Sequence, residues 1–216
     1  MRPPEAAGAI LDMDGTLLDT MGAWEAAPMD LLRERGVTCT ERMAAAFHGL
    51  GFEAAAEPIS QAYLPDCRPE ELMEEIVARL HRFYREAAPA KPGAEDLLRR
   101  LAGRRIPMAI LTSNRRELAC AALDRLGWRK YFRFILSARE CGMTKSDPEL
   151  FRLAAERLEA PPERCLVFED SLAPAKAAAA AGMRVMAVLD QSSRADWPAL
   201  RALAEASARD PGELIF

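Results

Sequence analysis

In the stretch Ala9-Ile10-Leu11-Asp12-Met13-Asp14-Gly15-Thr16, an apolar run passes directly into two acids and a glycine. Such a run is typical of a buried strand that delivers its last side chains to a loop. Two acids separated by one residue repel each other unless they share a cation or a proton. Mg²⁺ suits oxygen ligands of this kind, and Gly15 permits the sharp turn that brings both acids to one point. An acidic turn that caps a helix is the alternative this stretch leaves open.

Four further apolar runs follow along the chain, and helical patterns separate them. Strands are expected at 9–11, 106–111, 134–136, 165–168 and 185–189, and helices at 93–101, 116–126, 148–158 and 174–181. Strands that alternate with helices imply parallel βαβ units. The sequence therefore predicts an α/β fold with a doubly wound, mostly parallel sheet.

The stretch from Thr20 to Ala88 breaks this alternation, because it contains helical patterns without strands. Helices are expected at 24–35, 41–47, 52–63 and 70–86, with a short loop around His48 to Phe52. Prolines punctuate and close the stretch, and proline often marks a helix boundary. A loop of this length without structure of its own would be unusual in a compact domain. We therefore predict an α/β core from residues 1–19 and 89–216, and a small helical domain inserted at 20–88.

The composition is that of a globular protein, with 50% hydrophobic residues and a net charge of −4. A nucleic-acid-binding surface is normally strongly basic, so we expect no nucleic-acid partner. The sequence has no apolar run long enough to span a membrane, no apparent signal segment, and five scattered cysteines typical of reduced thiols. We expect a cytoplasmic protein without a membrane partner, and a monomer as the default for this size.

Three more groups of polar residues follow predicted strands, where ligands bind in open α/β sheets. Thr112-Ser113-Asn114 combines hydroxyls, an amide and a helix start, which together can donate hydrogen bonds to a phosphoryl group. Lys145 is one of four lysines in the chain and precedes an Asp-Pro helix start, where its charge could bind phosphate. Glu169 and Asp170 offer a second source of carboxylates for a metal. Taken singly, these groups are also typical of helix caps and of a surface lysine.

Together, the four groups resemble the motifs of the haloacid dehalogenase-like hydrolase superfamily, in the branch that includes beta-phosphoglucomutase and small-molecule phosphatases. The stretch from Asp12 to Thr20, DMDGTLLDT, resembles the first motif of that family. Thr112, Lys145 and the pair Glu169-Asp170 fall where the second, third and fourth motifs are found. The resemblance covers essentially the whole chain, and the insertion matches the helical cap of the family.

The resemblance implies a Mg²⁺-dependent phosphatase in which Asp12 attacks phosphorus and carries an aspartyl-phosphate. Asp14 would protonate the leaving oxygen and later take a proton from the attacking water. Mg²⁺ would be held by the carboxylates of Asp12 and Asp170 and by the backbone carbonyl of Asp14. Glu169 would orient Lys145 or a metal-bound water, and the substrate would be a small phosphorylated metabolite.

The same resemblance assigns the remaining positions of the predicted site. The phosphoryl oxygens would be bound by residues of three motifs: Asp12, Thr112, Ser113, Asn114 and Lys145. Gly15 and Thr16 would support the turn that holds the two acids. The candidates for contact with the rest of the substrate are Thr20, Trp24 and His48.

Several other activities share parts of this pattern. A dehalogenase does not need an acid at Asp14, and a phosphonate hydrolase of this family needs a cap lysine, whereas residues 20–88 contain none. A sugar phosphomutase remains the alternative, although similar mutases place a histidine where Trp24 stands and an arginine where residues 49–52 have none. A phospho-accepting receiver also combines Asp, Thr, Lys and Mg²⁺, but its acceptor lies in mid-chain. Simple hydrolysis is therefore favoured.

Overall fold

The computed structural model describes residues 5–216, apart from the side chains of residues 45–55. Contacts divide the chain into two compact units. The α/β unit comprises Met1–Asp19 and Ala88–Phe216, and the helical unit comprises Thr20–Ala87. Among the described residues, none of the helices is both long and apolar enough to cross a membrane.

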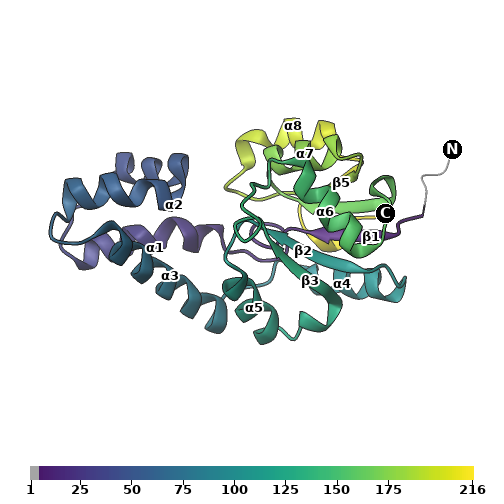
Figure 1. Ribbon diagram of the computed structural model, residues 1–216, viewed down its shortest axis with the longest axis horizontal. Coiled ribbons are helices and arrows are strands. Elements are labelled where there is room, and N and C mark those ends of the chain that lie inside the picture. Colours follow the sequence, from purple (N-terminus) through teal and green to yellow (C-terminus); the bar gives the residue numbers. More distant parts are fainter. Residues whose placement is uncertain (1–4) are drawn as a thin grey trace. The chain divides into compact units, whose positions relative to one another are not determined.

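The α/β unit is built on a six-stranded sheet in which every neighbouring pair is parallel (Figure 1). Its order is β3-β2-β1-β4-β5-β6. The strands are β1 (Gly8–Leu11), β2 (Met108–Thr112), β3 (Phe132–Ser137), β4 (Cys165–Glu169), β5 (Arg184–Val188) and β6 (Ala206–Ala208). The chain runs outward from β1 to β3 and then resumes on the other side of β1 with β4. Ligands bind outside the carboxyl ends of the strands at such a reversal, which here lies between β1 and β4.

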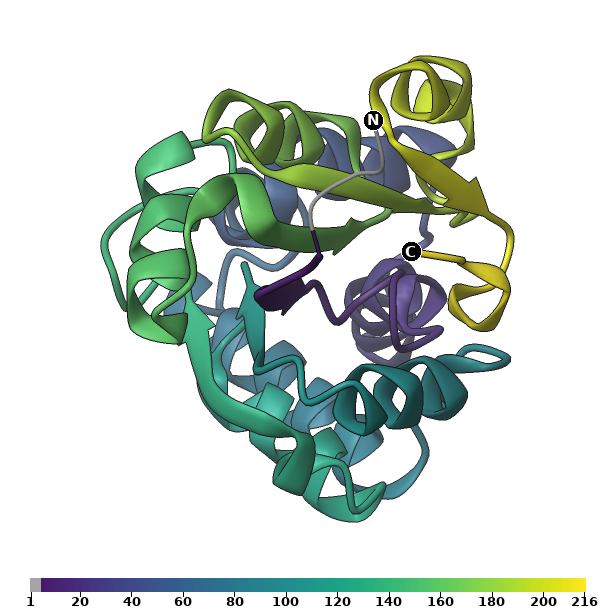
Figure 2. The ribbon, with the colours of Figure 1, turned by 90° about the vertical axis from the view of Figure 1, so that its right-hand side faces the viewer.

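Helices cover both faces of this sheet, as Figure 2 shows for α6 and α7 on one side and α4 on the other. They are α4 (Ala94–Gly103), α5 (Arg116–Arg125), α6 (Pro148–Leu158), α7 (Leu172–Ala180) and α8 (Trp197–Leu203). The start of α6 shows how the sequence fixes these ends: the side chain of Asp147 accepts a hydrogen bond from the N–H of Glu149, and proline occupies the first turn. The predicted doubly wound α/β fold is confirmed, although β6 and α8 were not predicted.

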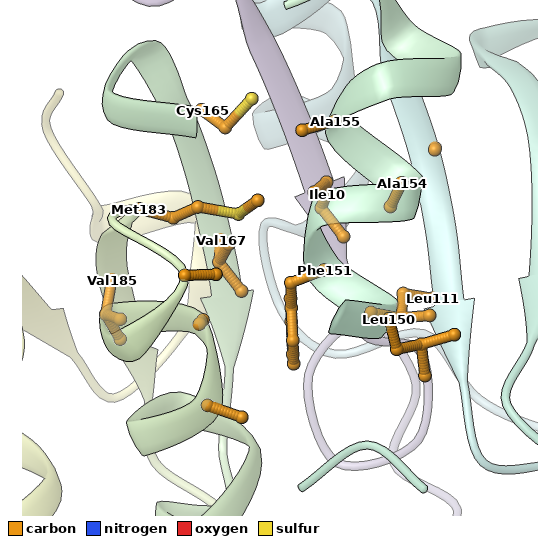
Figure 3. Packing of buried hydrophobic residues seen from close by; sticks show 14 of the residues in the cluster. Ile10, Leu111, Leu150, Phe151, Ala154, Ala155, Cys165, Val167, Met183 and Val185 are labelled. Carbon is orange, nitrogen blue, oxygen red and sulfur yellow. The ribbon is translucent and has the colours of Figure 1, made fainter. Parts of the chain in front are cut away.

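The core under α6 consists of aliphatic side chains that interdigitate with those of the central strands (Figure 3). Phe151 and Ala154 of α6 face Ile10 of β1, and Leu150 lies beside Leu111 of β2. All of these side chains are almost completely buried. Burial of one such side chain is worth about 1.5–3 kcal/mol, so this packing holds the strand ends in fixed positions.

The helical unit consists of α1 (Met21–Glu34), α2 (Glu41–Tyr63) and α3 (Pro69–Glu86). In α3, every fourth residue from Leu72 to Tyr84 is buried, which is the stripe expected of an amphipathic helix. The predicted loop around His48 to Phe52 is wrong, because α2 continues through it. Glycine in a helix interior costs only about 1 kcal/mol, so Gly49 and Gly51 do not end the helix. The side chain of His48 lies outside the described residues.

A buried ion pair joins two loops of the α/β unit. The ammonium of Lys91 lies 2.8 Å from a carboxylate oxygen of Asp190 and donates to the carbonyl of Leu189 at 2.7 Å. Asp190 also accepts hydrogen bonds from the N–H and the hydroxyl of Ser192. Burial opposes ionisation of Asp190, but the hydrogen bonds from Lys91 and Ser192 outweigh it and hold the pKa of Asp190 below its ordinary value. The pair therefore ties the segment that re-enters this unit to the loop after β5.

The variant Asp190→Asn should lose about 3–5 kcal/mol of unfolding free energy near pH 7, because it leaves Lys91 buried without a counter-charge. The double variant Lys91→Met, Asp190→Leu should recover most of that loss. Because the pKa of Asp190 is lowered, its ionised form contributes stability above about pH 4 and loses it as the pH falls further. Urea unfolding at a series of pH values should show the gap between wild type and Asp190→Asn closing below about pH 4. A gap that stays constant would contradict this account.

Candidate functional site

The candidate site lies where β1 and β4 end side by side. The two strands pair with Leu11 opposite Phe168, so Asp12 and Glu169 are the next residues on neighbouring strands. The N–H of Asp12 donates to the carbonyl of Phe168 at 3.0 Å and extends this register by one step. Both acidic side chains are buried, with 6% of Asp12 and 2% of Glu169 exposed. The register therefore brings two carboxylates from distant parts of the sequence to one point.

Lys145 joins these two carboxylates. Its ammonium lies 2.5 Å from one oxygen of Asp12 and 2.6 Å from one oxygen of Glu169. Burial opposes the charged form of Lys145, but the two carboxylates outweigh it and raise the pKa of its ammonium. Lys145 is therefore a fixed positive charge next to Asp12, and the surface position that the sequence left open for it is not what the structure shows.

Asp170 completes a group of three acids. Its carboxylate accepts a hydrogen bond from the hydroxyl of Thr16 at 3.0 Å, and its backbone carbonyl accepts one from the hydroxyl of Ser193 at 2.8 Å. Burial raises the pKa of Asp170 above its ordinary value, and the charges of Glu169 and Asp12 add to this effect. Ser193 was not predicted, because it lies in a loop that carries no recognisable motif.

Glu169 is more fully hydrogen-bonded than its neighbours. One of its oxygens accepts from Lys145, and the other accepts from the N–H groups of Asp170 and Ser171 at 3.2 and 3.1 Å. Burial raises the pKa of Glu169 to about 7, with Lys145 opposing that rise and the charge of Asp12 adding to it. Its carboxylate is thus used mainly to hold Lys145 and the turn after β4.

The three acids fit a divalent cation. Asp12, Glu169 and Asp170 each offer an oxygen within 4.8 Å of the others. One oxygen of Asp12 is buried and has no hydrogen-bond partner, which is costly unless a cation takes that place. Three buried carboxylates also face a single ammonium, and hard oxygen donors are the ligands that Mg²⁺ prefers. The structure groups Glu169 with Asp12 and Asp170, whereas the sequence pointed to the backbone carbonyl of Asp14 as the third ligand; that ligand set stays a prediction.

Asp14 is half-buried and contacts the loop that follows β2. Its carboxylate accepts a hydrogen bond from the side-chain amide of Asn114 at 3.2 Å. The hydroxyl oxygen of Thr112, which is buried, accepts a hydrogen bond from the N–H of Asn114 at 2.9 Å. The proton of that hydroxyl is therefore left to donate elsewhere, as a phosphate-binding role requires. Ser113 follows Thr112 but is exposed, so the structure does not hold it as it holds its neighbours.

Gly15 allows the 12–16 turn to approach Asp170. Its backbone has φ +89°, a conformation that favours glycine, and its N–H donates to the carbonyl of Leu18 at 2.8 Å. A Cβ at this position would lie 2.6 Å from a carboxylate oxygen of Asp170. Only a residue without a side chain therefore leaves room for that carboxylate beside the turn.

The candidates for substrate contact lie in the helical unit. Thr20 is fully buried. The indole N–H of Trp24 donates to the hydroxyl of Tyr84 at 2.7 Å, and the two rings meet edge to face with centroids 6.5 Å apart. This contact shows how Trp24 is held within its own unit. A role for Thr20, Trp24 or His48 in substrate contact stays a prediction.

The chain is similar to known hydrolases in sequence and to a solved structure in fold. The family model of haloacid dehalogenase-like hydrolases matches residues 7–182. The fructose-1-phosphate phosphatase YqaB of Escherichia coli is 33% identical over 177 residues, which cover 82% of this chain and 93% of that protein. A phosphorylated carbohydrates phosphatase of Thermotoga maritima is 32% identical over 178 residues, 81% of each chain. A solved structure assigned as a beta-phosphoglucomutase of the same organism superposes with a TM-score of 0.80 at 28% identity, over 97% of this chain and 96% of that one.

The variant Gly15→Ala should bind Mg²⁺ about 10- to 100-fold more weakly, because the new methyl group displaces the carboxylate of Asp170. Gly127→Ala is the matched control: Gly127 also has a positive φ, but its Cβ would meet no atom within 4 Å. Titration calorimetry with Mg²⁺ separates the effect of backbone strain from that of the clash with Asp170, since the control carries the strain alone. Equal Mg²⁺ affinity in wild type and Gly15→Ala would show that Asp170 does not bind the ion.

Proposed function

Because the chain belongs to the haloacid dehalogenase-like hydrolase family, we propose that it is a Mg²⁺-dependent phosphatase that hydrolyses a small phosphorylated metabolite through an aspartyl-phosphate on Asp12. The observation that carries this proposal is the environment of Asp12. One of its oxygens contacts Lys145, and the other is buried without a hydrogen-bond partner. A carboxylate flanked by a fixed ammonium and by a site for a cation is suited to attack an anionic phosphate.

In the proposed first step, a carboxylate oxygen of Asp12 forms a bond to phosphorus while the ester P–O bond breaks. Lys145 and the hydroxyl of Thr112 neutralise and hold the non-bridging oxygens, with Ser113 and Asn114 as further donors. Asp14, which the amide of Asn114 orients, gives its proton to the leaving oxygen. Mg²⁺, when bound to Asp12 and Asp170, supplies the remaining neutralisation of phosphate charge.

In the second step, Asp14 takes a proton from water, the water oxygen forms a bond to phosphorus, and the acyl-phosphate bond to Asp12 breaks. Inorganic phosphate leaves and both acids return to their starting protonation states. Glu169 keeps Lys145 in place throughout, because it accepts hydrogen bonds from that ammonium and from two backbone N–H groups. The helical unit acts as a cap that limits the access of water while the acyl-phosphate exists.

A sugar phosphate is the substrate class that the relatives favour. Two of them are named for fructose 1-phosphate and for phosphorylated carbohydrates. A phosphomutase is the second candidate function, because the superposed structure is assigned as a beta-phosphoglucomutase. Hydrolysis is preferred over that candidate, because Trp24 stands where similar mutases have a histidine. The indole N–H of Trp24 donates a hydrogen bond to the hydroxyl of Tyr84. A cytoplasmic, monomeric enzyme without nucleic-acid or membrane partners stays a prediction.

The variant Asp12→Asn should lose on the order of 10⁴-fold or more in kcat, because an amide cannot form the acyl-phosphate. Asp124→Asn, which changes an exposed acid on α5, is the control and should keep the wild-type rate. Release of inorganic phosphate from fructose 1-phosphate measures both. Substantial turnover by pure Asp12→Asn protein would exclude Asp12 as the nucleophile.

A panel of sugar phosphates, assayed with Mg²⁺ and with a chelator, should distinguish the two candidate functions. We expect phosphate release with Mg²⁺, its loss with the chelator, and its return when Mg²⁺ is added in excess. Conversion of one sugar-phosphate isomer to another without phosphate release would identify a mutase instead. Phosphate release that the chelator leaves unchanged would contradict the metal assignment.

A further inference from the structure

A hollow lies in the α/β unit, next to the edge strand β6. Its volume is about 480 Å³, and its wall comes from the loop after β5, the 3-10 turn η3 (Arg194–Asp196), α8 and the segment after β6. The residues that bear on its chemistry are Gln191, Arg194, Trp197, Arg201, Arg209 and Glu213. None of them belongs to the candidate active site, and no motif in the sequence marks this region.

Three arginines on this wall form no ion pair with a described residue. Within the described part of the chain, Arg194, Arg201 and Arg209 have no acidic group within ion-pair distance. Some arginines elsewhere are paired, as in the contact of Arg184 with Glu205 at 2.7 Å, and others are not. The three guanidinium groups on the wall of this one hollow concentrate positive charge in a chain whose net charge is −4, and such a patch attracts an anion.

Glu213 is the one acid among these six residues, and it is already occupied. A carboxylate oxygen of Glu213 accepts hydrogen bonds from the N–H groups of Arg209 and Asp210, at 3.3 and 3.5 Å. These contacts fix the turn after β6 and hold the carboxylate of Glu213 against the backbone of that turn. Its other oxygen can still accept a hydrogen bond from a hydroxyl group of a ligand.

Trp197 and Arg201 supply a mixed surface. They are four residues apart on α8, so their side chains lie one above the other on the same face of the helix. Trp197 is half-buried, which fixes the position of its ring while part of it lines the hollow. An aromatic ring beside a guanidinium can contact a planar or apolar group that is joined to an anion.

We propose that this hollow binds a small organic phosphate whose phosphate is attached to a planar or apolar group. The guanidinium groups of Arg194, Arg201 and Arg209 bind the phosphate oxygens through charge-assisted hydrogen bonds. The apolar part of the ligand lies against Trp197. A volume of about 480 Å³ falls within the range of small-molecule sites, so a ligand the size of a metabolite fits this hollow. Binding here involves no bond-making and is separate from the proposed hydrolysis.

Calorimetric titration with phenylphosphonate tests this proposal, because that dianion combines an aromatic ring with a group that has no ester bond to hydrolyse. The titration is done with chelator, since without a cation the three buried carboxylates of the candidate active site repel a dianion. Arg194→Gln and Arg201→Gln should each weaken binding about tenfold or more. Arg157→Gln, at an exposed arginine of α6 outside the hollow, should bind like wild type.

Methylphosphonate separates the role of Trp197 from that of the arginines. Wild type should bind phenylphosphonate more tightly than methylphosphonate, and Trp197→Leu should remove that difference while still binding methylphosphonate. Thermal unfolding of each variant checks that the variant is folded. The proposal is overturned if wild type binds neither compound at millimolar concentration, or if Arg194→Gln and Arg201→Gln bind phenylphosphonate as tightly as Arg157→Gln. Neither result bears on phosphatase activity, so this test can fail while the proposed function still holds.

Discussion

Three buried carboxylates crowd around one ammonium at the end of β1 and β4. Asp12, Glu169 and Asp170 lie within reach of a single ion, and Lys145 balances only part of their charge. Buried like charges of this density are unfavourable without a counter-ion. The arrangement is therefore suited to bind a divalent cation together with an anionic phosphate. The cation balances the charge of the carboxylates and of the phosphate.

The fold meets this constraint by bringing four strand ends to one edge. The parallel register of β1 and β4 sets Asp12 beside Glu169, and the chain reversal between these strands opens the edge for a ligand. Contacts from loops then hold the acids in place, through the hydroxyl groups of Thr16 and Ser193 on Asp170 and the amide of Asn114 on Asp14. Stability and chemistry are linked here, because the packed strands hold charges that would otherwise move apart.

Much of this arrangement could be predicted from the sequence, and the failures have physical causes. Buried parallel strands read as continuous apolar runs, so β1 to β5 were recognisable, whereas Ala-Ser-Ala in β6 carries no such signal. A short loop was expected around His48 to Phe52, but α2 continues through it. Acids after strands pointed to the site, but partners such as Ser193 lie in loops without periodicity. Pairing across the fold, as between Lys91 and Asp190, depends on tertiary geometry that no local pattern encodes.

Detection of the phosphoryl group on Asp12 during turnover would show directly that this residue is the nucleophile. Wild-type protein is mixed with fructose 1-phosphate and Mg²⁺, quenched in acid within milliseconds, digested and mapped by mass spectrometry. We expect a phosphorylated peptide in which Asp12 carries the group, formed before steady-state phosphate release and absent when a chelator is present. Phosphate release with no phosphorylated Asp12 at any quench time would contradict this mechanism, because hydrolysis would then proceed by direct attack of water.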